Sequence, residues 1–558
     1  MKLIVGIDFG TSTTVVRYRM EDSDVIYSLK DPSGNSDIFP TVIFKYSDYD
    51  ATDYGGQALV SATSGMRGNL IKNFKMDLLD PEKREEAQNY IIEFLTFIRE
   101  RFEEQTMGLN PSSTEIYISY PAKWDETMVR IMKDAVVAAG FNGIVKGRKE
   151  PEAATRNMLN NHLKELQRAK LLGSNKPLRI FMLDMGAGTT DISIFKLTID
   201  GEGVPNITEL LSYPSKVEKF LCGGREIDDA LQKYIKDYCE NGGLEYLDPE
   251  AITTFNIKNW KDLMVSPRLK KELPISLLPG VSTILRSQQR SDLIDSFHID
   301  RMDFEQATKE HWIKLYNLIK SAMAQYKYAK PEDIDFVCLT GGHSAWYTIP
   351  KLFNGEGVCN YIAKDGKDPD ALNFKKLKDE PWRMNAVLDG LPHESVAKGL
   401  CLMEQRMIYV TPSSNNVWAR LTINNEPGEI VQVVNKLDDV LPVVNREVSH
   451  AKDIERNIFF NNRNIDVQID LYIGETLENS EHRVLKLNQK VMSNIGALII
   501  ALIPLLNLIW FFAQMPFHIT VAMDVTMTDE GLLEINGRFA IDNNSPITFT
   551  YDDLCVVQ

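Results

Sequence analysis

The stretch of sequence that decides the fold is residues 4–16, which read IVGIDFGTSTTVV. An apolar strand ends at Asp8, Gly10 permits a tight turn, and hydroxyl side chains follow before a second apolar strand begins. Residues 180–194, IFMLDMGAGTTDISI, repeat this order around Asp184. One Asp-Gly turn also occurs in ordinary β-hairpins, so two matching copies are much stronger evidence. The sequence therefore predicts two related strand–turn–strand elements.

The residue types in these turns suit a phosphate group and a hydrated magnesium ion. Glycine lets backbone N–H groups approach phosphate oxygens, and threonine and serine add neutral donors. An aspartate at a strand end can hold waters around Mg²⁺, which keeps much of its hydration shell. A third element, residues 337–344 (VCLTGGHS), follows another apolar strand and carries a Gly-Gly pair against which a nucleotide can lie.

Composition and charge restrict the class of protein. The chain has 558 residues, of which 44% are hydrophobic and 25% charged, the ordinary balance of a globular protein. A formal net charge of −16 argues against binding to the phosphate backbone of nucleic acid. The six cysteines are scattered without a CxxC pair, which predicts a reducing compartment rather than a disulfide framework.

The first 400 residues alternate short apolar runs with longer helical patterns, which is typical of α/β domains. The acidic side chain of Asp8 interrupts the first apolar run before it reaches signal-peptide length, so a cytoplasmic protein is expected. Strands are expected at residues 3–7, 115–120, 180–183 and 336–339, and helices at residues 85–105, 125–139, 153–171 and 304–326.

The pattern changes after about residue 402. Residues 465–473 and 517–525 alternate apolar and other side chains with period two, as half-buried strands do. Residues 529–531 (DEG) provide a turn before another apolar run, which predicts a hairpin. A domain boundary is expected near residues 403–413, before an all-β region.

Further motifs occur in a fixed order along the first 400 residues. They are FPTVIF at residues 39–44, YPAKW at 120–124, EPEAA at 150–154, FLCGGREID at 220–228 and ESVAKG at 394–399. Together with the three glycine elements, they resemble the 70-kDa heat-shock chaperone (DnaK-like) family of the actin/hexokinase ATPase superfamily. The resemblance covers roughly residues 3–405 and extends more distantly to the strands beyond.

The resemblance implies a particular domain organisation. An α/β actin-like two-lobed ATPase domain would occupy residues 1–402, followed by an interdomain linker at residues 403–413. An all-β sandwich-like substrate-binding domain would occupy residues 414–558, with an apolar insert at 491–516 and no C-terminal helical lid.

The resemblance also implies roles for the residues that match the family's motifs. Asp8 and Asp184 would hold Mg²⁺ through waters, and Lys75 aligns with the catalytic lysine. Glu150, Asp184, Asp191 and Thr189 would complete the catalytic group. The other expected contacts to ATP or ADP come from Gly10, Thr11, Ser12, Thr13, Gly186, Ala187, Gly188, Gly223, Gly224, Lys270, Lys271, Gly341, Gly342 and Ser344.

Some of these residues have structural alternatives, and some positions depart from the family. Lys75 could be a surface lysine, and Glu150 could simply open a helix, where a carboxylate is favoured. Pro267 and Pro274 stand where the adenine-contacting helix of the family has glutamate and serine, and Val129 replaces an arginine. A catalytically weak nucleotide-binding scaffold with the same fold is therefore a second hypothesis, and a small-molecule kinase or filament-forming relative is a third.

Residues 495–515 carry no charged side chain and would be about 31 Å long as a helix, which matches a bilayer core. Three alternatives stay open: a spanning helix, a hairpin bent at Pro504–Asn507, and a buried or partner-binding loop. The first two alternatives would bring the protein into contact with a membrane through residues 495–515, as expected of a membrane-associated adaptor.

The function expected from the resemblance is that of an ATP-dependent chaperone. It would hydrolyse ATP with Mg²⁺ and couple its nucleotide state to binding of an extended polypeptide client, with co-chaperones as further partners and no nucleic acid.

Overall fold

The computed structural model describes most of the chain, with gaps, and it divides the chain into two compact units. The first comprises residues 1–123, 131–203 and 210–405, and the second comprises residues 124–130, 204–209 and 406–558. The residues outside the described part are 110, 122–123, 125, 170, 172–176, 201–202, 214–221, 245–246, 248–251, 254–256, 258–259, 274, 326–329, 355–373, 381–382, 385–391, 406, 413–415, 424, 435–439, 444–449, 460–464, 475–476, 479, 490–515, 528–532, 542–546 and 552–558.

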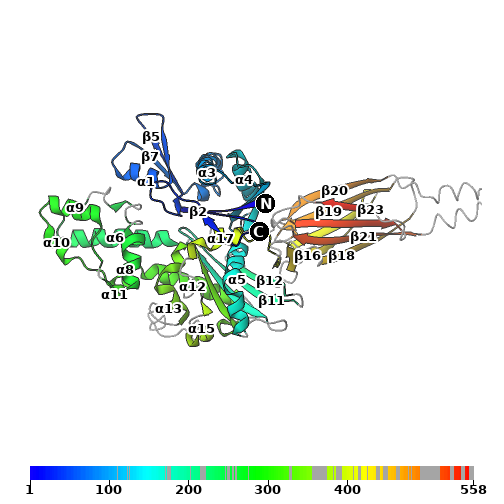
Figure 1. Cartoon of the computed structure of the whole chain (residues 1–558). Coiled ribbons are helices and arrows are strands. Elements are labelled where there is room, and N and C mark those ends of the chain that lie inside the picture. Colours follow the sequence, from blue (N-terminus) through cyan, green and yellow to red (C-terminus); the bar gives the residue numbers. More distant parts are fainter. Residues whose placement is uncertain are drawn as a thin grey trace, which may run out of the picture. The chain divides into compact units, whose positions relative to one another are not determined.

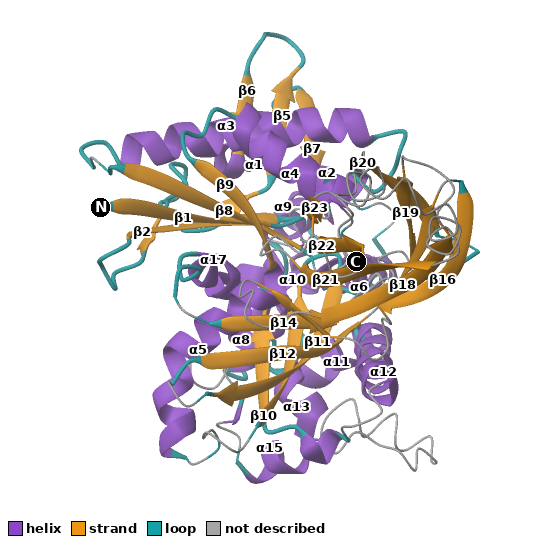
Figure 2. Ribbon diagram, turned by 90° about the vertical axis from the view of Figure 1, so that its right-hand side faces the viewer, coloured by secondary structure: helices purple, strands orange, loops and turns teal. Residues whose placement is uncertain are grey.

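The first unit contains a sheet with the strand order β3-β2-β1-β8-β9. Figure 1 labels β2 of this sheet, and Figure 2 labels β1, β2, β8 and β9. β1 runs antiparallel to β2 and parallel to β8, and β4 pairs with β2. The strands expected at residues 3–7 and 115–120 are confirmed as β1 and β8. The strands of this sheet are β1 (Lys2–Phe9), β2 (Thr13–Met20), β3 (Tyr27–Ser28), β4 (Phe39–Pro40), β8 (Ser113–Tyr120) and β9 (Ile144–Lys149).

The second sheet of this unit repeats the first. β10 (Leu178–Met185) runs antiparallel to β11 (Thr190–Ile199) and parallel to β13 (Phe336–Thr340). β12 (Pro205–Tyr213) follows β11 in the strand order, and its residues 205–209 belong to the second unit. The predicted relation between the two strand–turn–strand elements is therefore confirmed in their pairing as well as their sequence.

Helices lie against these sheets (Figure 2). Phe94 and Phe102 of α3 contact Phe9 and Tyr18 on one face of the first sheet, and α17 packs on β1 from the other face. The helices are α1 (Gly55–Thr63), α2 (Phe74–Asp77), α3 (Arg84–Gln105), α4 (Glu126–Ala138), α5 (Glu150–Arg168), α6 (Gly224–Asn241), η3 (Lys261–Val265), α8 (Ser266–Lys270), α9 (Pro279–Ser287), α10 (Ser291–Ser296), α11 (Arg301–Ala307), α12 (Lys309–Gln325), η4 (Pro331–Asp333), η5 (Gly342–Ala345), α13 (Thr348–Asn354), α15 (Lys375–Asp379), η7 (Pro392–Glu394) and α17 (Ser395–Leu400). A small sheet of β6 (Thr52–Tyr54), β5 (Val42–Tyr46) and β7 (Gly68–Lys72) completes the unit.

The single helix predicted over residues 304–326 is wrong, because two helices occupy this stretch. α11 begins at a capping box formed by Asp300 and Asp303 and ends before Thr308. The Thr308 hydroxyl donates a hydrogen bond to the Phe304 carbonyl at 2.6 Å, a local side-chain bond that competes with helix continuation. α12 then starts at Lys309.

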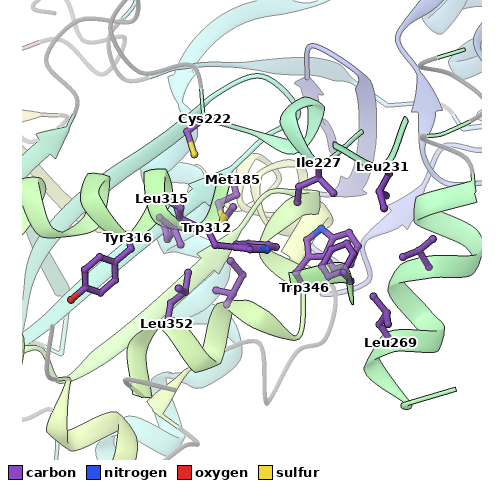
Figure 3. Packing of buried hydrophobic residues seen from close by; sticks show 14 of the residues in the cluster. Met185, Cys222, Ile227, Leu231, Leu269, Trp312, Leu315, Tyr316, Trp346 and Leu352 are labelled. Carbon is purple, nitrogen blue, oxygen red and sulfur yellow. The ribbon is translucent and has the colours of Figure 1, made fainter. Parts of the chain in front are cut away.

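A buried apolar cluster fixes the second sheet against its helices (Figure 3). Met185 lies at the end of β10, Ile227 and Leu231 come from α6, and Trp312 comes from α12. Since Met185 directly precedes the second glycine turn, this core holds that turn and the start of α6 in one place.

The described residues of the second unit form mainly β-sheets. Residues 465–473 and 517–525 lie in strands as predicted, and β21 pairs antiparallel with β22 as the hairpin requires. Residues 408–412, expected within the linker, form the strand β14, which pairs with β12 and β17. The strands are β14 (Ile408–Pro412), β15 (Asn416–Ile423), β16 (Glu426–Val434), β17 (Val440–Val443), β18 (His450–Phe459), β19 (Ile465–Gly474), β20 (Glu481–Gln489), β21 (Pro516–Met527), β22 (Leu533–Ile541) and β23 (Ile547–Tyr551).

The apolar segment at residues 495–515 lies outside the described residues. Within the described part of the chain, no helix is both long and apolar enough to cross a membrane. β21, which follows the segment, pairs antiparallel with β18 from His450↔Val525 to Phe459↔Pro516, whereas β20, which precedes the segment, pairs with β19. The strands on either side of the segment therefore belong to two different sheets.

Candidate functional site

The two glycine turns are built by the same backbone hydrogen bond. The Gly10 N–H donates to the Thr13 carbonyl at 3.0 Å, and the Gly186 N–H donates to the Thr189 carbonyl at 2.9 Å. In the first turn, the Ser12 carbonyl also accepts from the Thr41 N–H at 2.9 Å. The predicted phosphate-binding residues therefore stand in two equivalent, partly exposed turns.

A group of charged side chains gathers beside these turns. Asp8 ends β1, Asp184 ends β10, and Asp191 is the partner of Asp184 across the β10–β11 ladder. The Lys75 ammonium on α2 lies 3.1 Å from a carboxylate oxygen of Glu150 at the start of α5. Lys75 is only 4% exposed, so the alternative of a surface lysine is wrong. Glu150 does open a helix, but its carboxylate is also paired.

The electrostatics of the two strand-end aspartates show how close this group is. Desolvation by burial raises the pKa of Asp8 to about 7, with the negative charge of Glu150 as the next cause. Lys75 and a 2.8 Å hydrogen bond from the Ser119 hydroxyl act in the opposite direction. Burial raises the pKa of Asp184 well above its usual value, and Glu150, Asp191 and Asp8 add to this shift.

This charge balance fits a bound cation. Four carboxylates, those of Asp8, Glu150, Asp184 and Asp191, share the site with the single described ammonium of Lys75. Carboxylates that are recessed from water and face one another need positive charge nearby. A hydrated Mg²⁺, which proteins bind through one or two carboxylates and substrate phosphates, suits this donor set.

The backbones of Gly223, Gly224 and Gly341 lie close to the second turn. The Gly224 and Arg225 N–H groups donate to the carbonyls of Gly186 and Ala187 at 3.2 and 2.9 Å. A Cβ at Gly223 would lie 2.7 Å from the Ala187 carbonyl oxygen. Gly341 has a φ of +80°, and a Cβ there would lie 2.7 Å from an Asp184 carboxylate oxygen. Three glycine elements that are far apart in sequence thus meet around Asp184.

A buried polar cluster at the Gly224 side was not predicted from the sequence. The Lys261 ammonium forms a salt bridge with Asp228 and lies 3.2 Å from Nε2 of His343. The His343 ring occupies the place where a Cβ on Gly224 would point, 1.4 Å from Nε2. Lys261 has no motif around it, so only the folded chain brings it to the Gly-Gly elements.

The remaining predicted residues are less directly placed. Ser344 donates its hydroxyl to the Gly341 carbonyl at 2.8 Å, and Gly342 begins η5 with open space around it. Lys270 and Lys271 are exposed at the end of α8, and their expected nucleotide contact stays a prediction.

Comparison with known proteins shows which family the chain resembles. A family model described as "Hsp70 protein" matches residues 85–358. The chain is 28% identical over 266 residues to a "Chaperone protein HscA homolog" of Aliivibrio salmonicida (strain LFI1238), which covers 43% of this chain and 38% of that protein. It is 22% identical over 420 residues to a "Chaperone protein DnaK" of Thermosipho melanesiensis, covering 73% of this chain and 62% of the relative. The chain is 23% identical over 401 residues to a "Chaperone protein DnaK" of Ureaplasma urealyticum, and this match covers 70% of this chain and 58% of that relative.

The chain resembles the 70-kDa heat-shock chaperone family, whose model matches just under half of it. It spans 38 to 62% of the length of these relatives, so each match leaves more than a third of the relative uncovered. Members of the family are chaperone ATPases with an actin-like two-lobed nucleotide domain, and the duplicated sheets of the first unit accord with that architecture.

Proposed function

We propose that the chain binds ATP with Mg²⁺ and hydrolyses it at the site formed by Asp8, Lys75, Glu150, Asp184 and Asp191. The observation that carries this proposal is their convergence from five separate elements beside two phosphate-type turns. A merely structural arrangement would not gather four carboxylates around one ammonium, because their mutual repulsion costs stability.

The residues of the chain divide the work of phosphoryl transfer to water. The two turns offer backbone N–H groups and the hydroxyls of Thr11, Ser12 and Thr189 to phosphate oxygens. The Lys75 ammonium offsets negative charge that develops on the γ-phosphate, and Glu150 holds this lysine in place. Asp8 and Asp184 would hold Mg²⁺ through waters, and the ion would supply positive charge that offsets the charge of the phosphates.

The second unit is proposed to bind an extended polypeptide. Its described strands include a half-buried one, β15, in which Val417, Ala419, Leu421 and Ile423 are buried while the residues between them are more exposed. Sheets of this kind present edges and pockets to an extended chain. The nucleotide state is proposed to change the affinity for this client, with co-chaperones acting on the cycle.

To test this proposal, ATP binding and Mg²⁺-dependent single-turnover hydrolysis should be measured for the full-length wild type and for its Lys75→Ala and Asp184→Asn variants. Hydrolysis by the wild type that is lost in both variants supports the proposal. ATP binding without hydrolysis in the wild type would instead support the nucleotide-binding scaffold. Absence of ATP binding by the folded wild type would reject the proposed site.

A further inference from the structure

A second cluster of ligand-type side chains lies outside the proposed ATP site. Cys222 directly precedes the Gly-Gly turn, Glu226 lies in the first turn of α6, and His311 lies near the start of α12. Cys222 and His311 are buried, whereas the Glu226 carboxylate is 33% exposed. The thiol, the imidazole Nδ1 and a carboxylate oxygen all lie within 4.8 Å of one another.

The distances within this cluster approach those of a tetrahedral zinc site. The His311 Nδ1 lies 2.8 Å from Glu226 Oε2, and 3.9 Å from Cys222 Sγ. In a tetrahedral Zn²⁺ site the N and O ligands stand about 3.3 Å apart and each stands about 3.5 Å from the S ligand, given bond lengths of roughly 2.0 Å to N and O and 2.3 Å to S. The His311–Glu226 and Cys222–His311 distances would therefore change by only about half an ångström each.

We infer that Cys222, Glu226 and His311 form a binding site for a single Zn²⁺ ion. A sulfur, a nitrogen and an oxygen ligand are the set that zinc accepts and that Mg²⁺ does not favour. The exposed side of Glu226 leaves room for a water as the fourth ligand and provides the path by which the ion enters.

Every proton that zinc binding would displace at this site can be accounted for. Without metal, the His311 Nδ1–H donates to the ionised Glu226, whose other oxygen accepts from the Lys314 ammonium. Zinc at Nδ1 moves this proton to Nε2, which has no hydrogen-bond partner among the described residues and is free to carry it. The Cys222 thiol loses its proton to solvent, so one proton is released for each ion bound.

The site joins two parts of the first unit that are far apart in the sequence. Cys222 and Glu226 flank Gly223–Gly224, whose backbone contacts the second phosphate turn, and His311 belongs to α12. Cys222 also accepts a 2.6 Å hydrogen bond from Thr190 through its carbonyl. A bound ion would therefore fasten the start of α6 to α12.

The test uses the full-length chain, freed of metal and titrated with Zn²⁺ against a chromophoric chelator. We expect one Zn²⁺ per chain with submicromolar affinity, weakened roughly 100-fold or more in Cys222→Ser and His311→Ala. Cobalt(II) is expected to give a near-ultraviolet thiolate band in the wild type that is absent in Cys222→Ser. Zinc should also raise the melting temperature of the wild type but not of these variants.

Controls separate this site from adventitious binding. Cys239→Ser removes a buried thiol of α6 that is not part of the proposed site. His298→Ala removes the histidine of a separate group that contains Asp300 and Asp303. Both variants should bind zinc as the wild type does. Glu226→Gln changes a partly exposed side chain and tests the site without disturbing the core. The inference is overturned if the folded wild type binds no zinc below about 10 μM, or if affinity falls in His298→Ala and not in the ligand variants.

Discussion

Lys75 is the residue through which the proposed chemistry is most directly tested. Its side chain is nearly inaccessible to water, and its ammonium is paired with Glu150 across two elements. A buried ammonium held beside a group of carboxylates is available to a substrate's phosphates without prior reorganisation, which is where electrostatic stabilisation is largest.

Lys75→Ala is expected to lower the single-turnover rate of Mg·ATP hydrolysis by roughly 10²–10³-fold, since one oriented charge is lost from the transition state. ATP affinity should change by less than about 10-fold, because the two turns hold most of the phosphate contacts. Lys72→Ala, at an exposed lysine three residues earlier, is the matched control. Equal hydrolysis by the Lys75→Ala and Lys72→Ala variants would exclude the catalytic role.

Asp184→Asn is expected to raise the melting temperature of the nucleotide-free chain, because burial and three neighbouring carboxylates raise the pKa of Asp184 and disfavour its charge. A gain of about 1 kcal/mol is typical when a functional site is relieved of such strain. The same variant should lose the stabilisation that Mg·ATP gives to the wild type. Thermal melting of both proteins with and without Mg·ATP measures these two effects. A melting temperature of nucleotide-free Asp184→Asn below that of the wild type would contradict the prediction.

At this scale the sequence predicted the residues that belong to motifs. Asp8, Lys75, Glu150 and Asp184 were expected together because their neighbours match family motifs. Lys261 was not expected, because its contact with His343 spans 82 residues and nothing in its local sequence marks it. Contacts that tertiary packing alone creates leave no local pattern.

Between elements, close packing depends on a few positions. α17 crosses α5 where Gly399 meets Ala153, and a Cβ at residue 399 would lie 1.7 Å from the Ala153 carbonyl oxygen. α6 and η3 are joined by the buried Asp228–Lys261 pair. Both contacts connect elements that carry or support the proposed site.

Gly399→Ala is expected to destabilise the chain by about 3 kcal/mol, because the new methyl group must push two helix backbones apart. Gly34→Ala is the control, since a Cβ at Gly34 meets nothing within 4 Å. Thermal melting of the two variants should differ clearly, and similar melting temperatures would show that the crossing can relax.

Asp228→Asn is expected to cost about 3 kcal/mol or more, since it leaves the Lys261 charge buried without its carboxylate. Pairing it with Lys261→Met should recover much of that loss, because the uncompensated charge is then removed. Melting temperatures of the single and double variants measure this. A double variant no more stable than Asp228→Asn would show that the pair is not the main interaction at these positions.

Element type was easier to predict than element boundaries. Apolar periodicity continues from Phe304 through α12, so the sequence alone predicts one helix, yet the chain is divided into two helices at Thr308, whose hydroxyl bonds back to the Phe304 carbonyl. The strand at residues 408–412 was likewise hidden, because its pairing partners β12 and β17 lie elsewhere in the chain.

For the whole molecule, the proposed function requires communication between nucleotide and client. Addition of Mg·ATP to the full-length chain is expected to change its affinity for a fluorescent extended peptide by at least about 5-fold, a coupling of roughly 1 kcal/mol. Fluorescence anisotropy with ATP, with ADP and without nucleotide measures this effect. Lys75→Ala should keep the response to ATP but not return to the ADP value with time. Peptide affinity that is identical in all three states would mean that the two activities are independent.

The contact between α17 and α5 also limits how the first unit can move. Because no side chain separates Gly399 from Ala153, the two backbones touch at one point, and sliding along either helix would drive the Ala153 carbonyl into larger neighbours. α17 packs on β1 of the first sheet, whereas α5 also reaches β13 of the second. We therefore expect the two helices to turn about this crossing rather than slide past each other, so that a small rotation there would change the separation of the two phosphate turns.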